Sequence, residues 1–114
     1  MQFLALIHEN KNGWESLSDN DRQAVMQRYM SFSSKNEVVG GAELEDTGTA
    51  TTVRVRDGDR LVTDGPYAEV KEALGGYFIL ECDSIDEACR LAAEIPAAEH
   101  GAIEVRPVHM GEES

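Results

Sequence analysis

A short segment in the second half of the chain concentrates titratable side chains around a bend. Gly65 and Pro66 form the expected bend, and the titratable groups around it are Asp64, Tyr67, Glu69, Lys71 and Glu72. A carboxylate held by a rigid bend can act as a general acid or base. It can equally be a turn residue that hydrogen-bonds backbone amides. Asp64 is therefore our candidate catalytic residue, and the turn role stays open beside it.

Other polar groups can bind a ligand if the fold brings them together. A lysine screened from water can bind a carboxylate, although a lysine among carboxylates is more often an exposed ion pair. Tyrosines can donate hydrogen bonds into a pocket or to backbone, and histidines at element ends can reach the edge of a cleft. The candidate ligand-binding residues are Lys71, Glu72, Tyr67, Tyr77, Arg54, Glu104, Arg106, His8 and His100.

The sequence shows no pattern that holds a metal or a common cofactor. The three histidines lack metal-ligand spacing, and there is no phosphate-binding loop, dinucleotide fingerprint or serine-hydrolase elbow. Cys82 and Cys89 are too few for a zinc site or a disulfide framework, and both are expected in the core. We therefore predict no metal and no cofactor.

The composition is that of a soluble globular protein, and 114 residues are the length of one domain, 1–114. Its 22 acidic and 10 basic side chains give a formal net charge of −12, which repels phosphate backbones and anionic lipid. No stretch approaches the roughly 20 apolar residues of a membrane span, and the start lacks the features of a signal peptide. We expect a cytoplasmic protein without nucleic-acid or membrane partners.

Apolar periodicity predicts strands over 3–8, 38–44, 51–56, 60–63, 77–82 and 103–108. Two helices are expected, one from Ser18 to about residue 35 and one from Ser84 to about residue 95. Each has an acidic residue in the capping-box position, three residues after the serine. Asp57-Gly58 indicates a hairpin turn, and Gly40-Gly41 a bulge or a close backbone approach. Residues 68–74 are expected to form a turn or two of helix that Gly75-Gly76 ends.

This order of elements predicts an α+β fold: a ferredoxin-like antiparallel sheet with two helices on one face and an inserted β-hairpin. Strands 3–8 and 77–82 are apolar on both faces, yet two helices cover only one face. A second copy of the chain is the simplest cover for the other. We therefore expect a homodimer with facing sheets, whose polar strand residues line a cavity suited to a small acid if the dimer encloses them.

Several runs resemble the DGPF family of YCII-related proteins: 62–69, Lys71-Glu72, 74–77 and 103–108. The resemblance covers nearly the whole chain. It implies a dimeric α+β barrel of ferredoxin-like units, in small bacterial proteins without an established activity that are often associated with extracytoplasmic-function sigma factors. The motif positions it carries over, without an assigned role, are Asp64, Gly65, Pro66, Lys71, Glu72, Gly75, Gly76, Glu104 and Arg106.

The chain departs from that family in two places. The usual phenylalanine after Gly-Pro is Tyr67 here. The wider YCII-related group is thought to pair a histidine of the first helix with an aspartate before the proline that follows the second. Here the first helix has no histidine and Ile95 precedes Pro96, so that pair is not transferred.

Three functions remain open from the sequence. The first is a small-molecule-binding protein or enzyme that works by proton transfer in a dimer cleft. The second is a regulatory module whose acidic surface docks a basic partner surface, which the family resemblance implies is a sigma factor. In the third reading the Asp-Gly-Pro segment is a purely structural turn.

Overall fold

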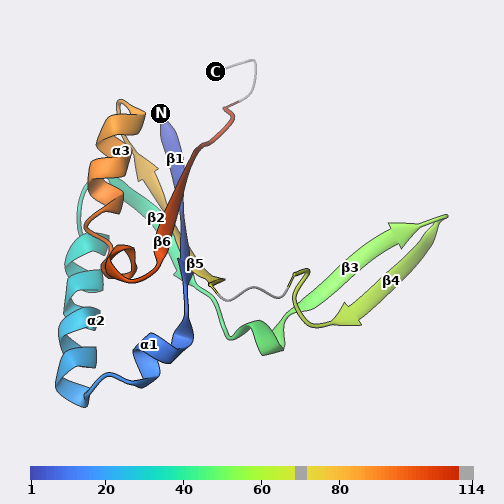
Figure 1. Ribbon diagram of the computed structural model, residues 1–114. Coiled ribbons are helices and arrows are strands. Elements are labelled where there is room, and N and C mark those ends of the chain that lie inside the picture. Colours follow the sequence, from blue (N-terminus) through green and yellow to red (C-terminus); the bar gives the residue numbers. More distant parts are fainter. Residues whose placement is uncertain (69–71, 111–114) are drawn as a thin grey trace.

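The computed structural model describes residues 1–68 and 72–110 (Figure 1). Its main sheet has the strand order β2-β5-β1-β6, and every neighbouring pair is antiparallel. This is the expected ferredoxin-like order, in which two split β-α-β units interleave: each unit has a strand of the other between its own two strands. The strands of this sheet are β1 (Gln2–Glu9), β2 (Val38–Glu43), β5 (Ala73–Glu81) and β6 (Ala102–Pro107).

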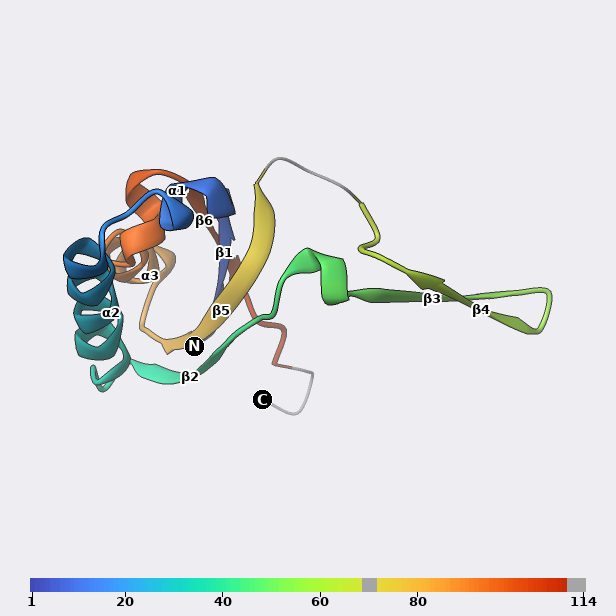
Figure 2. The same ribbon diagram turned by 90° about the horizontal axis from the view of Figure 1, so that it is seen from below.

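Helices α2 (Asp19–Ser33) and α3 (Ile85–Ala92) lie on the same side of the sheet (Figures 1 and 2). Both begin at the predicted serine caps. The backbone N–H of Asp21 donates to Ser18 Oγ at 3.1 Å, and that of Glu87 donates to Ser84 Oγ at 3.2 Å. These bonds satisfy N–H groups that have no partner within the helix. A further short helix, α1 (Lys11–Glu15), which was not predicted, lies between β1 and α2.

The core lies between this helical layer and the sheet. Alternate residues of β1 (Phe3, Ala5 and Ile7) are buried there with Leu80 of β5, while Phe32 of α2 meets Phe78 edge-on. Each such apolar side chain, once fully buried, contributes roughly 1.5–3 kcal/mol. The other alternation of β1 and β5 faces away from the helices and is only partly buried, as expected for strands that are apolar on both sides.

The inserted hairpin is a separate two-stranded sheet. Strands β3 (Thr51–Arg56) and β4 (Asp59–Asp64) pair with each other and project away from the main sheet (Figures 1 and 2). The predicted turn is present: Asp57 and Gly58 have φ values of 53° and 81°, as in a type I′ turn. We call β3, β4 and their turn the arm. The radius of gyration, 16.3 Å, exceeds the roughly 13 Å of a compact chain of this length because of it.

The prediction for the segment before β5 was wrong. Gly75 and Gly76 lie inside β5 and end no helix; residues 69–71 fall outside the described part, and Glu72 is in a bend. Gly75 is the extra residue of a β-bulge, since Ile7 pairs with Gly76 and His8 with Leu74. A Cβ on Gly76 would lie 2.8 Å from a backbone oxygen of β2, so this glycine permits close strand approach.

The close backbone approach expected at Gly40-Gly41 is present, and a β-bulge lies just before it at Val39. The register of β2 against β5 shifts between Val38 and Gly40, and a Cβ on Gly41 would lie 2.6 Å from the Tyr77 carbonyl oxygen. No helix within the described residues is long and apolar enough to cross a membrane.

The two cysteines have different environments. Cys82 is buried in the core as predicted, but Cys89 is exposed, so its assignment to the core was wrong. Leu91 of α3 is buried instead, because the helix presents Ala88, Leu91 and Ala92 to the sheet.

We expect thiol labelling to separate the two cysteines. Burial raises the pKa of the Cys82 thiol, and the nearby Glu87 carboxylate raises it further. Since the thiolate is the reactive form, Ellman's reagent should modify Cys89 rapidly and Cys82 only after unfolding. Cys89→Ser should remove the fast phase. Two fast thiols in the folded wild-type protein would contradict this arrangement.

Gly41→Ala should destabilise the fold by about 1–3 kcal/mol, because its Cβ cannot avoid the backbone of β5. Gly48→Ala is the matched control, since a Cβ there meets no atom within 4 Å; it should change the free energy of unfolding by less than about 0.5 kcal/mol. Urea unfolding measures both. Equal effects of the two substitutions would show that the close approach at Gly41 does not constrain the fold.

Candidate functional site

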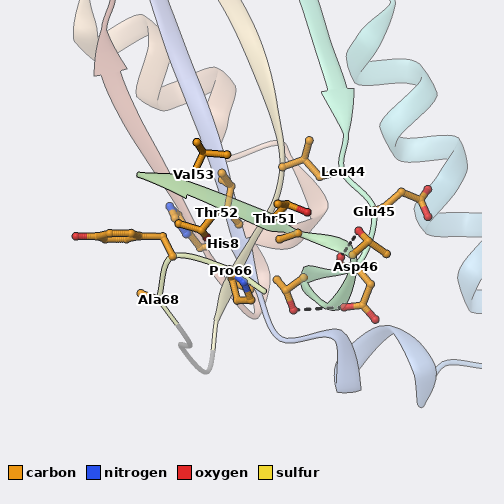
Figure 3. Close-up of a pocket in the computed structure, with 15 residues that line it drawn as sticks. His8, Leu44, Glu45, Asp46, Thr51, Thr52, Val53, Pro66 and Ala68 are labelled. Carbon is orange, nitrogen blue, oxygen red and sulfur yellow. Dashed lines mark hydrogen bonds between the residues drawn. The ribbon is translucent and has the colours of Figure 1, made fainter. Parts of the chain in front are cut away.

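A groove of about 770 Å³ lies where the arm leaves the body (Figure 3). This is within the range of roughly 300–1,000 Å³ that ligand sites occupy. Three parts of the chain line it: the end of β1 at His8, the connection from β2 to β3, and the described residues 66–68, 73 and 74. The described lining combines apolar Leu44 and Leu74 with hydroxyl, carboxyl and imidazole groups.

His8 and Glu104 form a pair at the edge of this groove. His8 Nε2 lies 3.1 Å from Glu104 Oε1, and the histidine side chain is 30% exposed. An ionised carboxylate only accepts hydrogen bonds, so Nε2 carries the hydrogen in this pair. Nδ1 of the neutral ring is then left to accept a proton. The arrangement is a histidine oriented by a carboxylate, as a general base requires.

Strand register brings these two residues together. In the pairing of β1 with β6, Leu6 is opposite Glu104 and His8 is opposite Ala102, so His8 and Glu104 are diagonal neighbours on one sheet face. The bulge at Gly75 bends β5 beside His8. Gly101 lets the backbone before β6 approach His8 closely, because a Cβ at this position would collide with the His8 carbonyl oxygen. Gly101 was not among the predicted site residues; its only sequence signal is a glycine just before a strand.

The Asp-Gly-Pro segment builds a wall of the groove. Gly65 has φ 110°, a left-handed conformation that favours glycine. Its N–H donates to the Ala50 carbonyl at 2.7 Å, and its carbonyl accepts from Thr52 Oγ1 at 2.8 Å. These bonds close the base of the arm and place Pro66 and Tyr67 in the lining.

Tyr67 itself is 80% exposed. The Arg54 guanidinium lies 5.3 Å from the centre of its ring, a distance at which the two attract.

The structure gathers only part of the predicted site. Among the described residues, His8, Pro66 and Tyr67 line the groove, and Glu104 joins them through His8. Other candidates lie elsewhere: Tyr77 and Arg106 on the sheet face opposite the helices, Arg54 and Asp64 on the arm, and Glu72 and His100 in exposed connections. Lys71 lies outside the described residues. Asp64 is exposed and does not line the groove, so its catalytic role stays a prediction.

The connection from β2 to β3 was not predicted to belong to the site. It supplies Leu44, two acidic residues and two threonines to the lining, namely Glu45, Asp46, Thr47 and Thr49. The only sequence signal was a polar run between two strands. In the described lining, only His8 can carry a positive charge. No cluster of three or more potential metal ligands occurs in residues 1–68 and 72–110.

Comparison with known proteins agrees with this architecture. The profile of the YCII-related domain matches residues 1–110. The uncharacterised protein R00369 of Rhizobium meliloti (strain 1021) is 38% identical over 117 residues, which cover 95% of this chain and 92% of the relative.

A solved structure extends the comparison to the fold. The 5-chloro-2-hydroxyhydroquinone dehydrochlorinase TftG of Burkholderia phenoliruptrix AC1100, in complex with 2,5-dihydroxybenzoquinone, superposes with a TM-score of 0.51. The alignment covers 99% of this chain and 98% of that one at 17% identity, which is evidence for a shared fold. The match over residues 1–110 and the 38% identical relative show that the chain belongs to the YCII-related family.

Proposed function

We propose that the groove binds a small polar organic molecule and that His8, oriented by Glu104, exchanges a proton with it. The observation that carries the proposal is the 3.1 Å His8–Glu104 pair at the edge of a groove of ligand size. Histidine is the side chain most often used for such transfer. Acid/base chemistry at this pair requires neither a metal nor a cofactor.

The transfer follows from the geometry of the pair. Nδ1 of the neutral His8 ring takes a proton from a hydroxyl or an acidic C–H group of the ligand, and the ring becomes an imidazolium. The Glu104 carboxylate stabilises that cation through Nε2–H. A positioned general base of this kind typically accelerates a reaction by about 10²–10⁴-fold. Return of the proton to another atom of the ligand restores the neutral ring.

The charge of the protein limits the ligand. The formal net charge is −12, and the groove lining includes Glu45 and Asp46. A strongly anionic ligand would be repelled, whereas a neutral molecule with a weakly acidic hydroxyl would not. Apolar Leu44 and Leu74 can contact a hydrocarbon ring. The hydroquinone and quinone named for TftG, which shares the fold, are consistent with a hydroxylated ring as the ligand class.

The regulatory alternative rests on the acidic surface alone. A net charge of −12 favours docking to a basic protein surface. No sigma factor is named in the comparisons, and the groove has no part in that function. Association with a sigma factor therefore stays a prediction.

We expect hydroquinone, as a neutral probe, to shift the ring resonances of His8 in an NMR titration. His8→Ala should weaken its binding at least about tenfold, a loss of about 1.4 kcal/mol. His100→Ala is the matched control, because His100 is exposed and does not line the groove. Asp64→Ala should also leave the affinity unchanged. A loss of binding in Asp64→Ala with retention in His8→Ala would assign the site to Asp64 instead.

Benzoate, an anionic ring of similar size, should bind more weakly than hydroquinone at low salt. Raising the ionic strength from about 0.01 to 0.15 M shortens the Debye length from about 30 to 8 Å, so repulsion from the acidic protein falls. Benzoate affinity should therefore rise with salt, while hydroquinone affinity stays constant. Calorimetric titration measures both. Tighter benzoate binding at low salt would show that the site selects anions.

A further inference from the structure

Tyr67 brings an aromatic ring to the groove and leaves most of it uncovered. The residue lines the groove, yet 80% of its surface is exposed. Within the described lining, it is the one aromatic side chain besides the imidazole of His8. Aromatic rings offer a large apolar area that proteins usually bury in cores and interfaces. The exposed ring of Tyr67 is therefore a surface that a bound molecule can cover.

The backbone that carries this ring is restrained. The Gly65 N–H donates to the Ala50 carbonyl at 2.7 Å, and the Gly65 carbonyl accepts from Thr52 Oγ1 at 2.8 Å. The pyrrolidine ring of Pro66 then fixes its own φ. Because Tyr67 follows directly, its side chain starts from a position that the base of the arm sets.

Arg54 fixes the direction of the ring. It is two residues beyond Thr52 on β3, so both side chains are on the same face of that strand. Since Thr52 holds Gly65 on this face, Arg54 comes next to Tyr67, with its guanidinium over the ring at 5.3 Å from the centre. Guanidinium groups attract the face of an aromatic ring. One face of Tyr67 is thereby occupied, and the high exposure of the residue leaves the opposite face free.

We propose that the free face of Tyr67 stacks on an aromatic ring of the ligand and so positions a ring hydroxyl for His8. The inference rests on the proposed function, because the hydroxyl that is positioned is the one whose proton His8 takes. Tyr67 exchanges no proton in this scheme and acts by orienting the ligand. It gives this chain a reason of its own to prefer a hydroxylated aromatic ring to a saturated alcohol.

The restraint on Tyr67 makes its ring a good stacking surface. A side chain that is ordered before the ligand arrives loses little freedom on binding. Offset-stacked aromatic pairs also gain attraction beyond the apolar area that they bury. A saturated ring of similar size lacks the π system for this gain, so it should bind more weakly at the same place.

The charge of Arg54 acts on the same ligand through the ring. Its guanidinium lies against Tyr67 and does not line the groove, so the ligand does not contact it directly. When His8 removes a hydroxyl proton, negative charge develops on the stacked ring. A positive charge on the far side of Tyr67 lowers the energy of that anion and offsets part of the repulsion from Glu45 and Asp46 in the lining.

Tyr67→Leu tests the stacking, with Tyr67→Phe as the conservative variant. Leucine keeps apolar area but has no aromatic face, so hydroquinone should bind about two- to twelvefold more weakly in calorimetric titration. Tyr67→Phe should restore most of that affinity. The ring current should also move the hydroquinone proton resonance upfield in wild type and Tyr67→Phe, a shift that a merely structural role would not produce. Wild-type affinity in Tyr67→Leu would overturn the proposal.

Arg54→Leu tests the orientation of the ring, and Arg56→Leu is its matched control. Arg56 is the next residue on the same face of β3, and its guanidinium donates to the Val55 carbonyl at 2.9 Å. Both variants therefore remove one positive charge from the same strand. Arg54→Leu should weaken hydroquinone binding about two- to fivefold, and Arg56→Leu should leave it unchanged. Equal losses would show that only net charge matters and would overturn the role of Arg54.

A saturated analogue separates this inference from the proposed function. A cyclohexanediol with opposite hydroxyls resembles hydroquinone without its aromatic ring, so Tyr67→Leu should weaken binding of hydroquinone but not of the cyclohexanediol. Weakened hydroquinone binding in His8→Ala, with none in Tyr67→Leu, would leave the His8 site standing and overturn stacking alone. Unchanged His8 resonances together with a Tyr67-dependent upfield shift would overturn the proposed function and leave a stacking site without His8. Absence of hydroquinone binding by wild type would overturn both.

Discussion

The structure depends on a sheet that its own helices cover on one side only. Phe3, Ala5 and Ile7 of β1 are buried against the helical layer, whereas Leu4 and Leu6 on the opposite face remain partly exposed. Both helices are needed for the buried side, and their serine caps fix where each begins. The apolar residues of the other side therefore have no cover within the described chain. The projecting arm also has exposed apolar side chains, namely Val53, Val55 and Val62.

The candidate site is a consequence of how strands end at one edge of this sheet. The bulge at Gly75 and the close approach at Gly101 shape the backbone around His8. The register of β6 then sets Glu104 diagonally beside it. The bend at Gly65 contributes by joining the arm to the connection before it. The Asp-Gly-Pro segment thus forms a wall of the groove, while His8 and Glu104 come from strands at either end of the chain.

The acidic charge of the protein limits which molecules can bind to it. A net charge of −12 opposes anionic ligands and opposes association of two copies through their bodies. The ligand proposed for the groove is accordingly neutral and weakly acidic.

The sequence by itself determined the features that local physics controls. Serine caps, the alternation of the strands, the Asp57-Gly58 turn and the close approach at Gly40-Gly41 each follow from a few neighbouring residues, and together they predicted the order of the sheet. Only the tertiary structure decided that Gly75 and Gly76 lie inside a strand, that Cys89 is exposed, and that His8 meets Glu104. Those outcomes depend on the register between strands and on how a helix is rotated against the sheet. Register and rotation are set by contacts between residues as far apart as 96 positions, which no local pattern encodes.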